Sequence, residues 1–476
     1  MIKSNINMIS PNSKTIKKGG LFIALRGENQ DGTKYIEEAI QNGAVAIITH
    51  SDVKTQNIPD KIEVIKTDNP RQYYAQYCAK FYQPKPKYFS AVTGTNGKTS
   101  VANFTQQIWD KKGYNAIATG TLGFTGCGCE PKSSLTTPEP ALLHQQLKQV
   151  AQEKQVDFVC MEASSHGLDM NRLDGIEFTS AGFTNLSRDH LDYHKNMNEY
   201  FKAKSYLFEK LLSPDGYAVL NSTIPEYNQL KEICDKRKIK TISYGLLEKS
   251  KNGIIPDIHV IGYKTSSTGF DVDMSVMGVE MQTNIQIAGL FQIENILCAL
   301  GLSGINNDIV ENAQFIDSVS GVRGRLEYIG MTQKGGIVYV DYAHTPDALK
   351  TVLQTMRNHS KKKLNVLIGC GGNRDAGKRP IMGKIACDYA DNAYITDDNP
   401  RNEKPANIRR DMMVGAVDGI EIDGRENAIM QSVKELEQGD ILIVAGKGHE
   451  QGQIVGDKIL PFDDSKIIRK AILENS

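Results

Sequence analysis

The chain has 476 residues, a length that predicts about three domains at the usual domain size. Its 56 Lys and Arg residues balance 56 Asp and Glu residues, so there is no overall basic field to recruit nucleic acid or an anionic membrane surface. The eight cysteines are scattered, the first residues lack the apolar core of a signal peptide, and no apolar run approaches the ~20 residues of a membrane helix. We therefore expect a soluble cytoplasmic protein with reduced thiols.

Residues 1–87 predict a small α/β unit. Short apolar runs indicate strands over 21–25, 45–49 and 62–66, with a helix over 34–42 between the first two. A further helix should run from Pro70 through Phe81, because Asp68 or Asn69 can cap it and a proline suits its first turn. The Pro-Lys-Pro stretch at 84–86 is typical of a domain linker.

A glycine-rich loop at residues 93–100, Thr-Gly-Thr-Asn-Gly-Lys-Thr-Ser, follows a predicted strand over 88–92. Its two glycines allow the backbone N–H groups to approach an anion, its lysine supplies a positive charge, and Thr99 can ligate Mg²⁺. A helix over 101–112 should follow and end at Gly113. The general P-loop pattern is not matched, because Val92 stands where it requires glycine. The competing interpretation is a tight turn with an incidental lysine.

Polar residues follow two more predicted strands in the central region. The strand over 156–161 ends in Glu162, and a carboxylate at a strand end in an α/β sheet is well placed to hold a metal ion. The run over 181–186 leads in the same way to the polar cluster 187–194. Between the loop and these strands, Thr136 and Thr137 precede a predicted helix over 139–149, where their hydroxyls would lie at a helix N-terminus.

Some residues of this region have a plain structural explanation. Lone histidines such as His166 and His194 are more often structural than functional. By sequence alone, Lys204 would pass for a solvated lysine on a helix.

From about residue 322 onward, strands and helices alternate, as expected for a doubly wound sheet. A helix over 289–300 precedes this part. We expect strands over 337–340, 364–368, 393–396 and 441–444, and helices near 347–358, 379–390 and 406–415. Polar clusters follow the strands at 341–346, 371–375, 397–401 and 446–450. Since ligands bind at the carboxyl ends of strands in open sheets, these clusters predict a pocket for a zwitterionic substrate.

Together these segments resemble the Mur ligase family, cytoplasmic enzymes that add amino acids to the peptidoglycan precursor. The resemblance rests on the loop at 94–99, the run 184–194 followed by 200–208, the helix at 289–300 and the segment 321–327. It implies an α/β fold of three domains: a UDP-sugar-binding N-terminal domain over 1–87, a central P-loop-like ATPase domain over 88–321, and a Rossmann-like amino-acid-binding domain over 322–476.

The resemblance also implies roles for individual residues. ATP would contact Gly94, Thr95, Asn96, Gly97, Lys98, Thr99, Ser100, Asn295, Arg325, Asp341 and His344. The UDP-sugar dipeptide would contact Ser13, Thr136, Thr137, Ser164, Met170 and Arg172. Mg²⁺ would be held by Thr99, Glu162, His190 and Lys204, the last as a carbamate. Lys98, Glu162, His190 and Lys204 would be catalytic, and the amino acid would contact Arg374, Asp398, Asn399, Pro400, Arg401, Gly446 and Glu450.

Two positions depart from the family pattern. The N-terminal segment reads Asn12-Ser13-Lys14 where the family usually has Asp-Ser-Arg, so only the serine carries over. Met170 stands where the family often has glutamine, which removes one potential hydrogen bond to substrate.

Within the family, the resemblance implies ATP-dependent addition of meso-diaminopimelate to a UDP-N-acetylmuramoyl-dipeptide through an acyl phosphate, by a protein we expect to be a monomer. Asp-Asn-Pro-Arg at 398–401 carries this choice, although the same four letters at 68–71 are explained by helix capping. The alternatives are a lysine-adding muramyl ligase, a ligase like folylpolyglutamate synthetase, which normally lacks the N-terminal domain, and a nucleotide-binding regulatory protein without catalysis.

Overall fold

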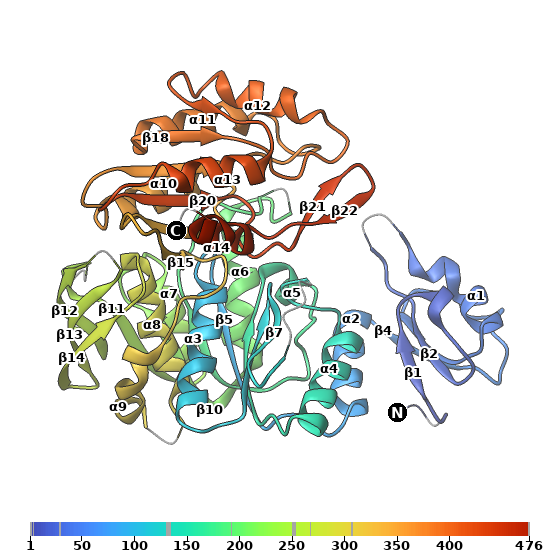
Figure 1. Cartoon of the computed structure of the whole chain (residues 1–476). Helices are drawn as coiled ribbons and strands as arrows, with labels where there is room; N and C mark the ends of the chain where they lie inside the picture. Colours follow the sequence, from blue (N-terminus) through green and yellow to red (C-terminus); the bar gives the residue numbers. More distant parts are fainter. Residues whose placement is uncertain are drawn as a thin grey trace. The chain divides into compact units, whose positions relative to one another are not determined.

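The computed structural model describes residues 2, 4–27, 30–129, 135–191, 193–249, 254–266, 268–305 and 308–474. The chain divides into two compact units, Met1–Ser243 and Tyr244–Ser476. Figure 1 labels their helices and strands. Among the described residues, no helix combines the length and apolar character needed to cross a membrane.

The N-terminal sheet has four parallel strands in sequence order: β1 (Met8–Ser10), β2 (Gly20–Ile23), β3 (Ala44–His50) and β4 (Glu63–Thr67). Alternate residues of β2 point to opposite faces, so Leu21 and Ile23 join one core cluster and Phe22 joins another. The predicted helices are present as α1 (Ile36–Gln41), after a 3-10 turn at Gly32–Tyr35, and α2 (Pro70–Phe81). Asn69 caps α2 as predicted. The sequence analysis did not predict β1, whose three residues are too few for a periodic pattern.

The rest of the first unit is built on a mostly parallel sheet. Its strand order is β10 (Leu212–Asn221), β9 (Phe178–Phe183), β5 (Tyr88–Thr93), β8 (Phe158–Glu162), β6 (Ala116–Gly120) and the antiparallel β7 (Gly123–Thr125). The helices are α3 (Lys98–Lys111), α4 (Pro140–Glu153), α5 (Ser165–Asp169), α6 (Met197–Tyr206) and α7 (Tyr227–Lys236). Several predicted bounds differ from the observed ones: α3 begins at Lys98 instead of 101, and α4 extends to Glu153 instead of 149. The strand β9 spans Phe178–Phe183, so 184–186 are not strand.

The strand β11 (Lys240–Leu246) crosses the boundary between the units. In the second unit it pairs in parallel with β12 (Ile258–Thr265), which continues antiparallel into β13 (Phe270–Val276) and β14 (Val279–Ile285). The helices α8 (Leu290–Ser303) and α9 (Ile309–Asn312) follow. The sequence analysis predicted α8 and none of these four strands.

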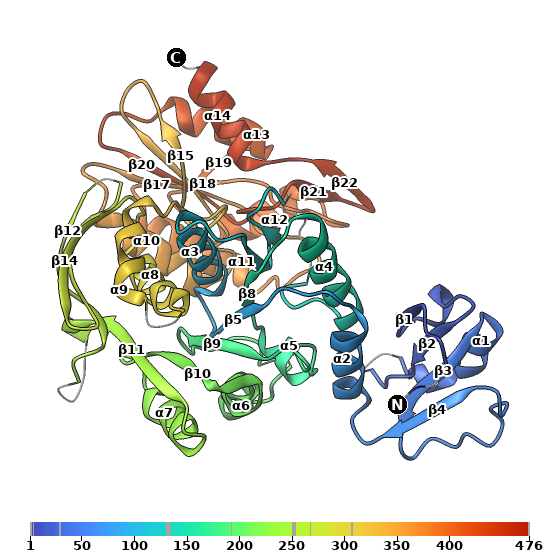
Figure 2. The ribbon, with the colours of Figure 1, turned by 90° about the horizontal axis from the view of Figure 1, so that it is seen from below.

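The last sheet has the order β15 (Glu327–Met331), β16 (Ile337–Asp341), β20 (Ile441–Ala445), β17 (Leu364–Ile368), β18 (Asn392–Ile395) and β19 (Ile420–Glu421). Only β15 is antiparallel. The helices are α10 (Pro346–Arg357), α11 (Lys378–Tyr389), α12 (Pro405–Met413), α13 (Arg425–Lys434) and α14 (Asp464–Glu474). Figure 2 shows α13 and α14 side by side. Separate core clusters cover the two faces, so the predicted doubly wound sheet is confirmed.

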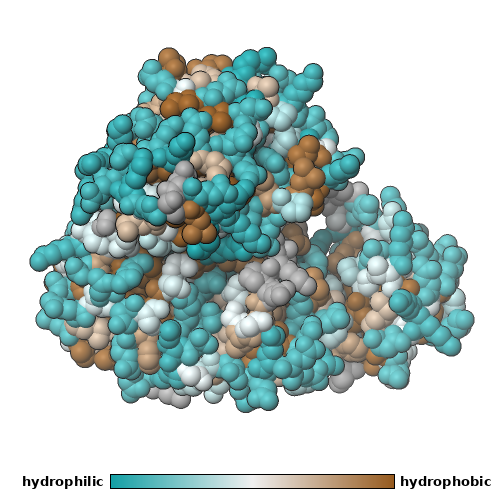
Figure 3. Space-filling view, viewed as in Figure 1, coloured by the Kyte–Doolittle hydropathy of each residue, from teal (hydrophilic) through white to brown (hydrophobic). Residues whose placement is uncertain are grey.

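A two-stranded hairpin, β21 (Gly452–Val455) and β22 (Lys458–Pro461), leaves this domain after β20. Val455, Ile459 and Leu460 are exposed on it. Figure 3 shows hydrophobic residues gathered at the place that the hairpin takes in Figure 1. The hairpin follows the predicted polar cluster 446–450 directly, so its position bears on the site described next.

Candidate functional site

The loop between β5 and α3 requires its glycines. Gly94 and Gly97 have φ angles of 144° and 89°, and a Cβ on Gly94 would lie 1.9 Å from Thr184 Oγ1. Because α3 begins at Lys98, its N-terminal N–H groups follow the loop without a gap. A loop of this geometry before a helix N-terminus suits an anion, and the phosphate contacts of its residues stay predictions.

Two lysines converge on the same carbonyl of this loop. Lys98 Nζ donates to Gly94 O at 2.9 Å and to Thr95 O at 2.8 Å, and Lys204 Nζ donates to Gly94 O at 2.7 Å. The interpretation of Lys204 as a solvated lysine is wrong, because its side chain is buried and its amine lies 4.5 Å from the centre of the Tyr200 ring. Burial, with a smaller contribution from the charge of Lys98, lowers the pKa of Lys204 well below its usual range.

The buried carboxylate of Glu162 lies at the end of β8, as predicted. Its Oε2 accepts a hydrogen bond from Thr99 Oγ1 at 3.0 Å, and its Oε1 accepts one from the backbone N–H of Thr121 at 2.9 Å. A Cβ at Gly120 would lie 2.0 Å from Glu162 Oε1, so this carboxylate needs a glycine beside it. The two side chains predicted to hold a metal from the loop and from β8 thus touch each other.

His190 lies in a group of aromatic side chains. Its ring is 5.0 Å from His166, and His166 is 4.1 Å from Tyr193 and 5.4 Å from His194. His194 is buried, and burial together with the charge of His166 lowers its pKa. Among the residues that the structure describes, no three His, Cys, Asp or Glu side chains form a metal-binding group, so the predicted Mg²⁺ contacts of His190 and Lys204 stay predictions. Asp192, part of the predicted cluster, lies outside those residues.

Several residues predicted to contact the UDP-sugar dipeptide lie near the backbone of Glu162. Thr137 Oγ1 donates to Glu162 O at 3.0 Å and lies 3.0 Å from Ser164 Oγ, and Arg172 Nη1 donates to Thr137 O at 2.9 Å. Thr136 Oγ1 lies 3.0 Å from Thr121 Oγ1. The expectation that these threonines lie at the start of the following helix was wrong: Glu139 precedes α4, without a side-chain cap.

Two further members of that set have local roles. Met170 ends α5, and its backbone N–H donates to His166 O at 2.9 Å. Ser13 Oγ donates to Glu38 Oε2 at 2.6 Å within the N-terminal domain. Neither observation tests a nucleotide contact.

In the second unit, the residues predicted to contact ATP are connected to one another through neighbouring residues. Asn295 Nδ2 donates to Gln292 Oε1 at 2.9 Å, and Gln292 Nε2 donates to Arg325 O at 3.2 Å. The guanidinium of Arg325 lies 4.8 Å from the centre of the Tyr342 ring, which is 4.6 Å from the His344 ring. Asp341 is buried, which raises its pKa, and its two oxygens accept backbone N–H groups of Leu326 and Ala343. The Asp341 carboxylate therefore holds the backbone of Leu326 and of Ala343 in place.

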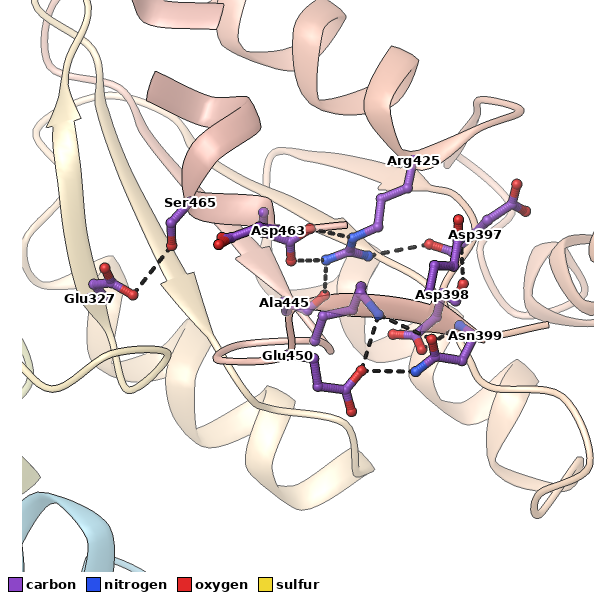
Figure 4. A network of polar contacts seen from close by, with 12 residues as sticks. Glu327, Asp397, Asp398, Asn399, Arg425, Ala445, Glu450, Asp463 and Ser465 are labelled. Carbon is purple, nitrogen blue, oxygen red and sulfur yellow. Dashed lines mark hydrogen bonds and ion pairs between the residues drawn. The ribbon is translucent and has the colours of Figure 1, made fainter. Parts of the chain in front are cut away.

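The predicted amino-acid residues come together at the carboxyl ends of β18 and β20. Asn399 Nδ2 donates to Glu450 Oε2 at 2.8 Å, and Figure 4 shows the two side chains side by side. A Cβ on Gly446 would lie 2.9 Å from Asp398 Oδ2. Arg401 has a φ of 50°, and its Nη1 donates to Gly372 O at 2.9 Å. Arg374, from the loop after β17, is exposed.

The buried side chains that support this cluster were not predicted from the sequence. Arg425 and Asp464 form a fully buried ion pair at 2.6 Å. Arg425 also donates to Ala445 O at 2.9 Å and to Asp397 O at 3.3 Å, as Figure 4 shows. Lys447 is also fully buried. Of these three residues, Lys447 could have been found from the sequence, because it lies between Gly446 and Glu450 in a predicted polar cluster. Arg425 and Asp464 could not, because they are far apart in the chain.

Comparison with known proteins gives three family matches in chain order. Residues 5–82 match the family model described as Mur ligase family, catalytic domain, residues 92–303 the Mur ligase middle domain, and residues 324–448 the Mur ligase, glutamate ligase domain. The predicted architecture of three α/β domains is thereby confirmed, whereas the predicted boundaries at 87/88 and 321/322 stay predictions.

Full-length relatives agree with these matches. A protein of Bradyrhizobium diazoefficiens named UDP-N-acetylmuramoyl-L-alanyl-D-glutamate--2,6-diaminopimelate ligase is 41% identical over 469 residues, covering 98% of this chain and 94% of its own. A solved structure with the same name is 30% identical with a TM-score of 0.72, covering 98% of this chain and 95% of its own. The structure of MurF ligase from Thermotoga maritima in complex with ADP is 15% identical, covers 100% of this chain and 98% of its own, and has a TM-score of 0.60, which shows a shared fold.

Proposed function

Because the chain belongs to the Mur ligase family, we propose that it is an ATP-dependent ligase that joins meso-diaminopimelate to the D-glutamate of UDP-N-acetylmuramoyl-L-alanyl-D-glutamate. ATP would phosphorylate the glutamate carboxylate, and the amine of diaminopimelate would attack the acyl phosphate. An amide bond forms as phosphate leaves, so the products are the UDP-linked tripeptide, ADP and phosphate.

The observation that carries the amino-acid assignment is the setting of Arg401. Its guanidinium uses Nη1 on the main-chain carbonyls of Gly372 and Asn399, while Nε and Nη2 make no hydrogen bond to the residues that the structure describes. Those two donors form the fork that binds a carboxylate with two parallel hydrogen bonds. Diaminopimelate carries a second carboxylate at the end of its side chain, which lysine lacks.

Glu450 suits the opposite charge of the same substrate. Its Oε2 is bound by Asn399 and Lys447, while its Oε1 has no partner within the described part of the chain. The side chain is one-third exposed, at 33%. A carboxylate that is held in place with one free oxygen can accept a hydrogen bond from a substrate ammonium group. An anionic and a cationic recognition group in one cluster match a zwitterion.

The loop after β5 supplies the chemistry for phosphoryl transfer. Lys98 and the N-terminus of α3 would stabilise the negative charge of the transferring phosphoryl group, and this electrostatic term is usually the largest in such reactions. The hydroxyl and backbone groups of residues 94–100 would hold the remaining phosphate oxygens. Asn295, Arg325 and His344 are the proposed contacts to the rest of ATP.

The oxygen donors beside the loop fit Mg²⁺. Thr99 and Glu162 present a hydroxyl and a carboxylate that already contact each other at 3.0 Å, and hard oxygen ligands are those that Mg²⁺ prefers. We propose that these two residues would hold one ion, and that His190 and a carbamate on Lys204 would hold a second. Bound there, Mg²⁺ would neutralise phosphate charge.

The remaining contacts follow the same proposal. Thr136, Thr137, Ser164 and Arg172 would hold the UDP-linked dipeptide near Glu162, with Met170 beside them and Ser13 in the N-terminal domain. Both ATP and the UDP-linked dipeptide are cytoplasmic metabolites, so the proposed location is the cytoplasm. We propose a monomer, which light scattering of the purified protein would test.

One assay separates this proposal from the alternatives. Purified protein is incubated with ATP, Mg²⁺ and UDP-N-acetylmuramoyl-dipeptide, and phosphate release and the product mass are measured with diaminopimelate or lysine. A parallel reaction contains a folate and glutamate in place of the dipeptide and the amino acid. We expect release with diaminopimelate and a product heavier by one diaminopimelate residue. Equal or better use of lysine would support a lysine-adding ligase, and release only with a folate and glutamate would support a folylpolyglutamate-type ligase. Nucleotide binding without turnover would support the regulatory alternative.

A match of residues 5–82 to the family favours the first outcome over a folylpolyglutamate-type enzyme, which normally lacks an N-terminal domain of this kind.

A further inference from the structure

Lys447 is a cation enclosed entirely within the C-terminal domain. Its side chain has 0% exposure. Its ammonium donates to Asn399 Oδ1 at 3.1 Å, Glu450 Oε2 at 3.0 Å and Gly452 O at 2.7 Å. An ammonium group has three protons to donate, so all of them can be used in these bonds. The ring of Phe462 lies 5.9 Å from the same nitrogen.

These bonds leave the Asn399 side chain little freedom. Its Oδ1 accepts from Lys447 and from the backbone N–H of Ile454 at 2.9 Å, while its Nδ2 donates to Glu450 Oε2. Glu450 Oε2 in turn accepts from both Asn399 and Lys447. The Asn399 amide therefore connects Lys447 to Glu450, beside which it lies in Figure 4. These bonds hold the Glu450 carboxylate and so set the direction of Oε1, the oxygen without a partner in the described part of the chain.

The same lysine ties the cluster to the hairpin. Gly452, whose carbonyl it binds, is the first residue of β21. Further along the hairpin, the backbone N–H of Arg401 donates to Ile454 O at 3.0 Å, and that of Gly456 donates to Arg401 O at 2.8 Å. The segment 398–401, the loop 446–450 and the hairpin thus share Lys447 as a common partner. The backbone of Arg401 is fixed by the hairpin that Lys447 anchors.

We propose that Lys447 is a positioning residue for the amino-acid substrate: it orients the Glu450 carboxylate directly and the Arg401 guanidinium through the hairpin. The inference rests on the proposed function, since it takes Glu450 and Arg401 as the groups that contact the amino acid. A buried cation is costly unless paired and hydrogen-bonded, and apolar residues would serve packing at least as well here. Its side-chain partners instead are Asn399 and Glu450, two polar residues of the predicted amino-acid cluster.

The test compares steady-state phosphate release by wild type, Lys447→Met and Lys458→Met while each of the three substrates is varied in turn. Methionine keeps the length of the side chain and removes the charge and donors. We expect Lys447→Met to raise KM for diaminopimelate roughly 10- to 100-fold, because bonds to charged groups are lost, with KM for ATP and the UDP-dipeptide within about twofold of wild type. Lys458, exposed on β22 of the same hairpin, is the matched control and should change nothing.

A double-mutant cycle distinguishes positioning from general support of the fold. If Lys447 acts through Glu450, the pair Lys447→Met with Glu450→Gln should raise KM for diaminopimelate little beyond Glu450→Gln alone. Effects that multiply would overturn the inference, as would an unchanged KM for diaminopimelate in Lys447→Met or an equal rise of KM for all three substrates.

Two further arms keep the outcome interpretable. If Lys447→Met does not fold, Lys447→Gln, which retains an amide donor without the charge, is measured in the same way and judged by the same criteria. If wild type uses a different amino acid, the proposed function fails, but the cycle can be run with that amino acid. If wild type uses diaminopimelate and the variants behave like it, only the role of Lys447 fails.

Discussion

Lys204 is buried, which its place in α6 does not reveal from the sequence, and this burial changes the chemistry of its amine. A lysine with a lowered pKa spends more time as a neutral amine, the form that can react with carbon dioxide to give a carbamate. The structure supplies both conditions, burial and a second cation, Lys98, bound to the same carbonyl. A carbamate would reverse the charge at this point, from an amine that competes with Lys98 to an anion that balances it.

Replacing Lys204 should therefore remove activity in a way that an added anion repairs. We expect Lys204→Ala to lose turnover by about 100-fold or more, the typical cost of removing one group that stabilises transition-state charge. Acetate or formate in the assay should partly restore turnover in this variant and leave wild type unaffected. Lys202→Ala, an exposed lysine on the same helix, is the control. Full activity of Lys204→Ala without any added carboxylate would rule the carbamate out.

Arg401 and Arg71 allow a comparison of the same four letters in two settings. Arg401 follows a strand of the C-terminal sheet, and its Nε and Nη2 bond to no residue in the described ranges. Arg71 instead lies in the first turn of α2 and donates to Arg26 O at 2.9 Å. We expect Arg401→Ala to raise KM for diaminopimelate about 100-fold, because an unpaired substrate carboxylate is left in the pocket, and to shrink the preference over lysine. Arg71→Ala should do neither. KM values for both amino acids check this, and full discrimination by Arg401→Ala would refute the assignment.

At the scale of elements, the loop between β5 and α3 depends on one backbone position. Gly94→Ala would place a Cβ 1.9 Å from Thr184 Oγ1 at a φ of 144°, so the loop must move away from Thr184, the residue that follows β9. We expect KM for ATP to rise at least about tenfold, since the N–H groups lose their common focus. Gly113→Ala, at a φ of 92° with nothing within 4 Å, should cost about 1 kcal/mol of stability and leave KM for ATP unchanged. Equal effects of the two variants would show that backbone strain alone acts at Gly94.

Elements with strong local signals were the ones that the sequence predicted. Asn69 with Pro70 marks the start of α2 to the residue, and the apolar runs of β17 and β20 give buried strands. The antiparallel strand β13 had a usable signal that was overlooked, an alternation of apolar and polar residues over Phe270–Val276. It matches the burial of the strand except at Ser275, which is buried. The three residues of β1 carry too short a pattern to detect.

The candidate site shows a different limit. Its residue types came from motifs, but its support came from contacts that spacing cannot reveal, such as Lys447 to Asn399 across 48 positions and Arg425 to Asp464 across 39. The burial of Lys204 likewise follows from tertiary packing of α6. Threonines that precede a helix in sequence were assigned to its N-terminus, and in the structure Thr137 binds the end of β8 because that partner lies closer in space.

Across the whole molecule, each compact unit holds a histidine that is buried in its neutral form. His144 on α4 is 1% exposed, its two ring nitrogens have no hydrogen-bond partner among the described residues, and burial lowers its pKa to about 3. In the second unit, burial and the nearby Arg325 lower the pKa of His449 to about 4. Since both pKa values lie below the unfolded value of about 6.5, the unfolded chain binds more protons than the folded one throughout the range between them.

Acid should therefore destabilise both units well before carboxylates titrate. The stabilising contribution of each histidine is complete above about pH 6.5 and declines as the pH falls below that value, until the folded state itself binds the proton near pH 4 for His449 and pH 3 for His144. At pH 5, each of the two histidines should have lowered the free energy of unfolding of its unit by about 2 kcal/mol. Urea unfolding at pH 7, 6 and 5 measures this loss. His144→Leu, which cannot titrate, should reduce the pH dependence of the first unit by about that amount and leave the second unchanged. An unchanged slope in His144→Leu would mean that this ring is already protonated, or solvated, in the folded protein.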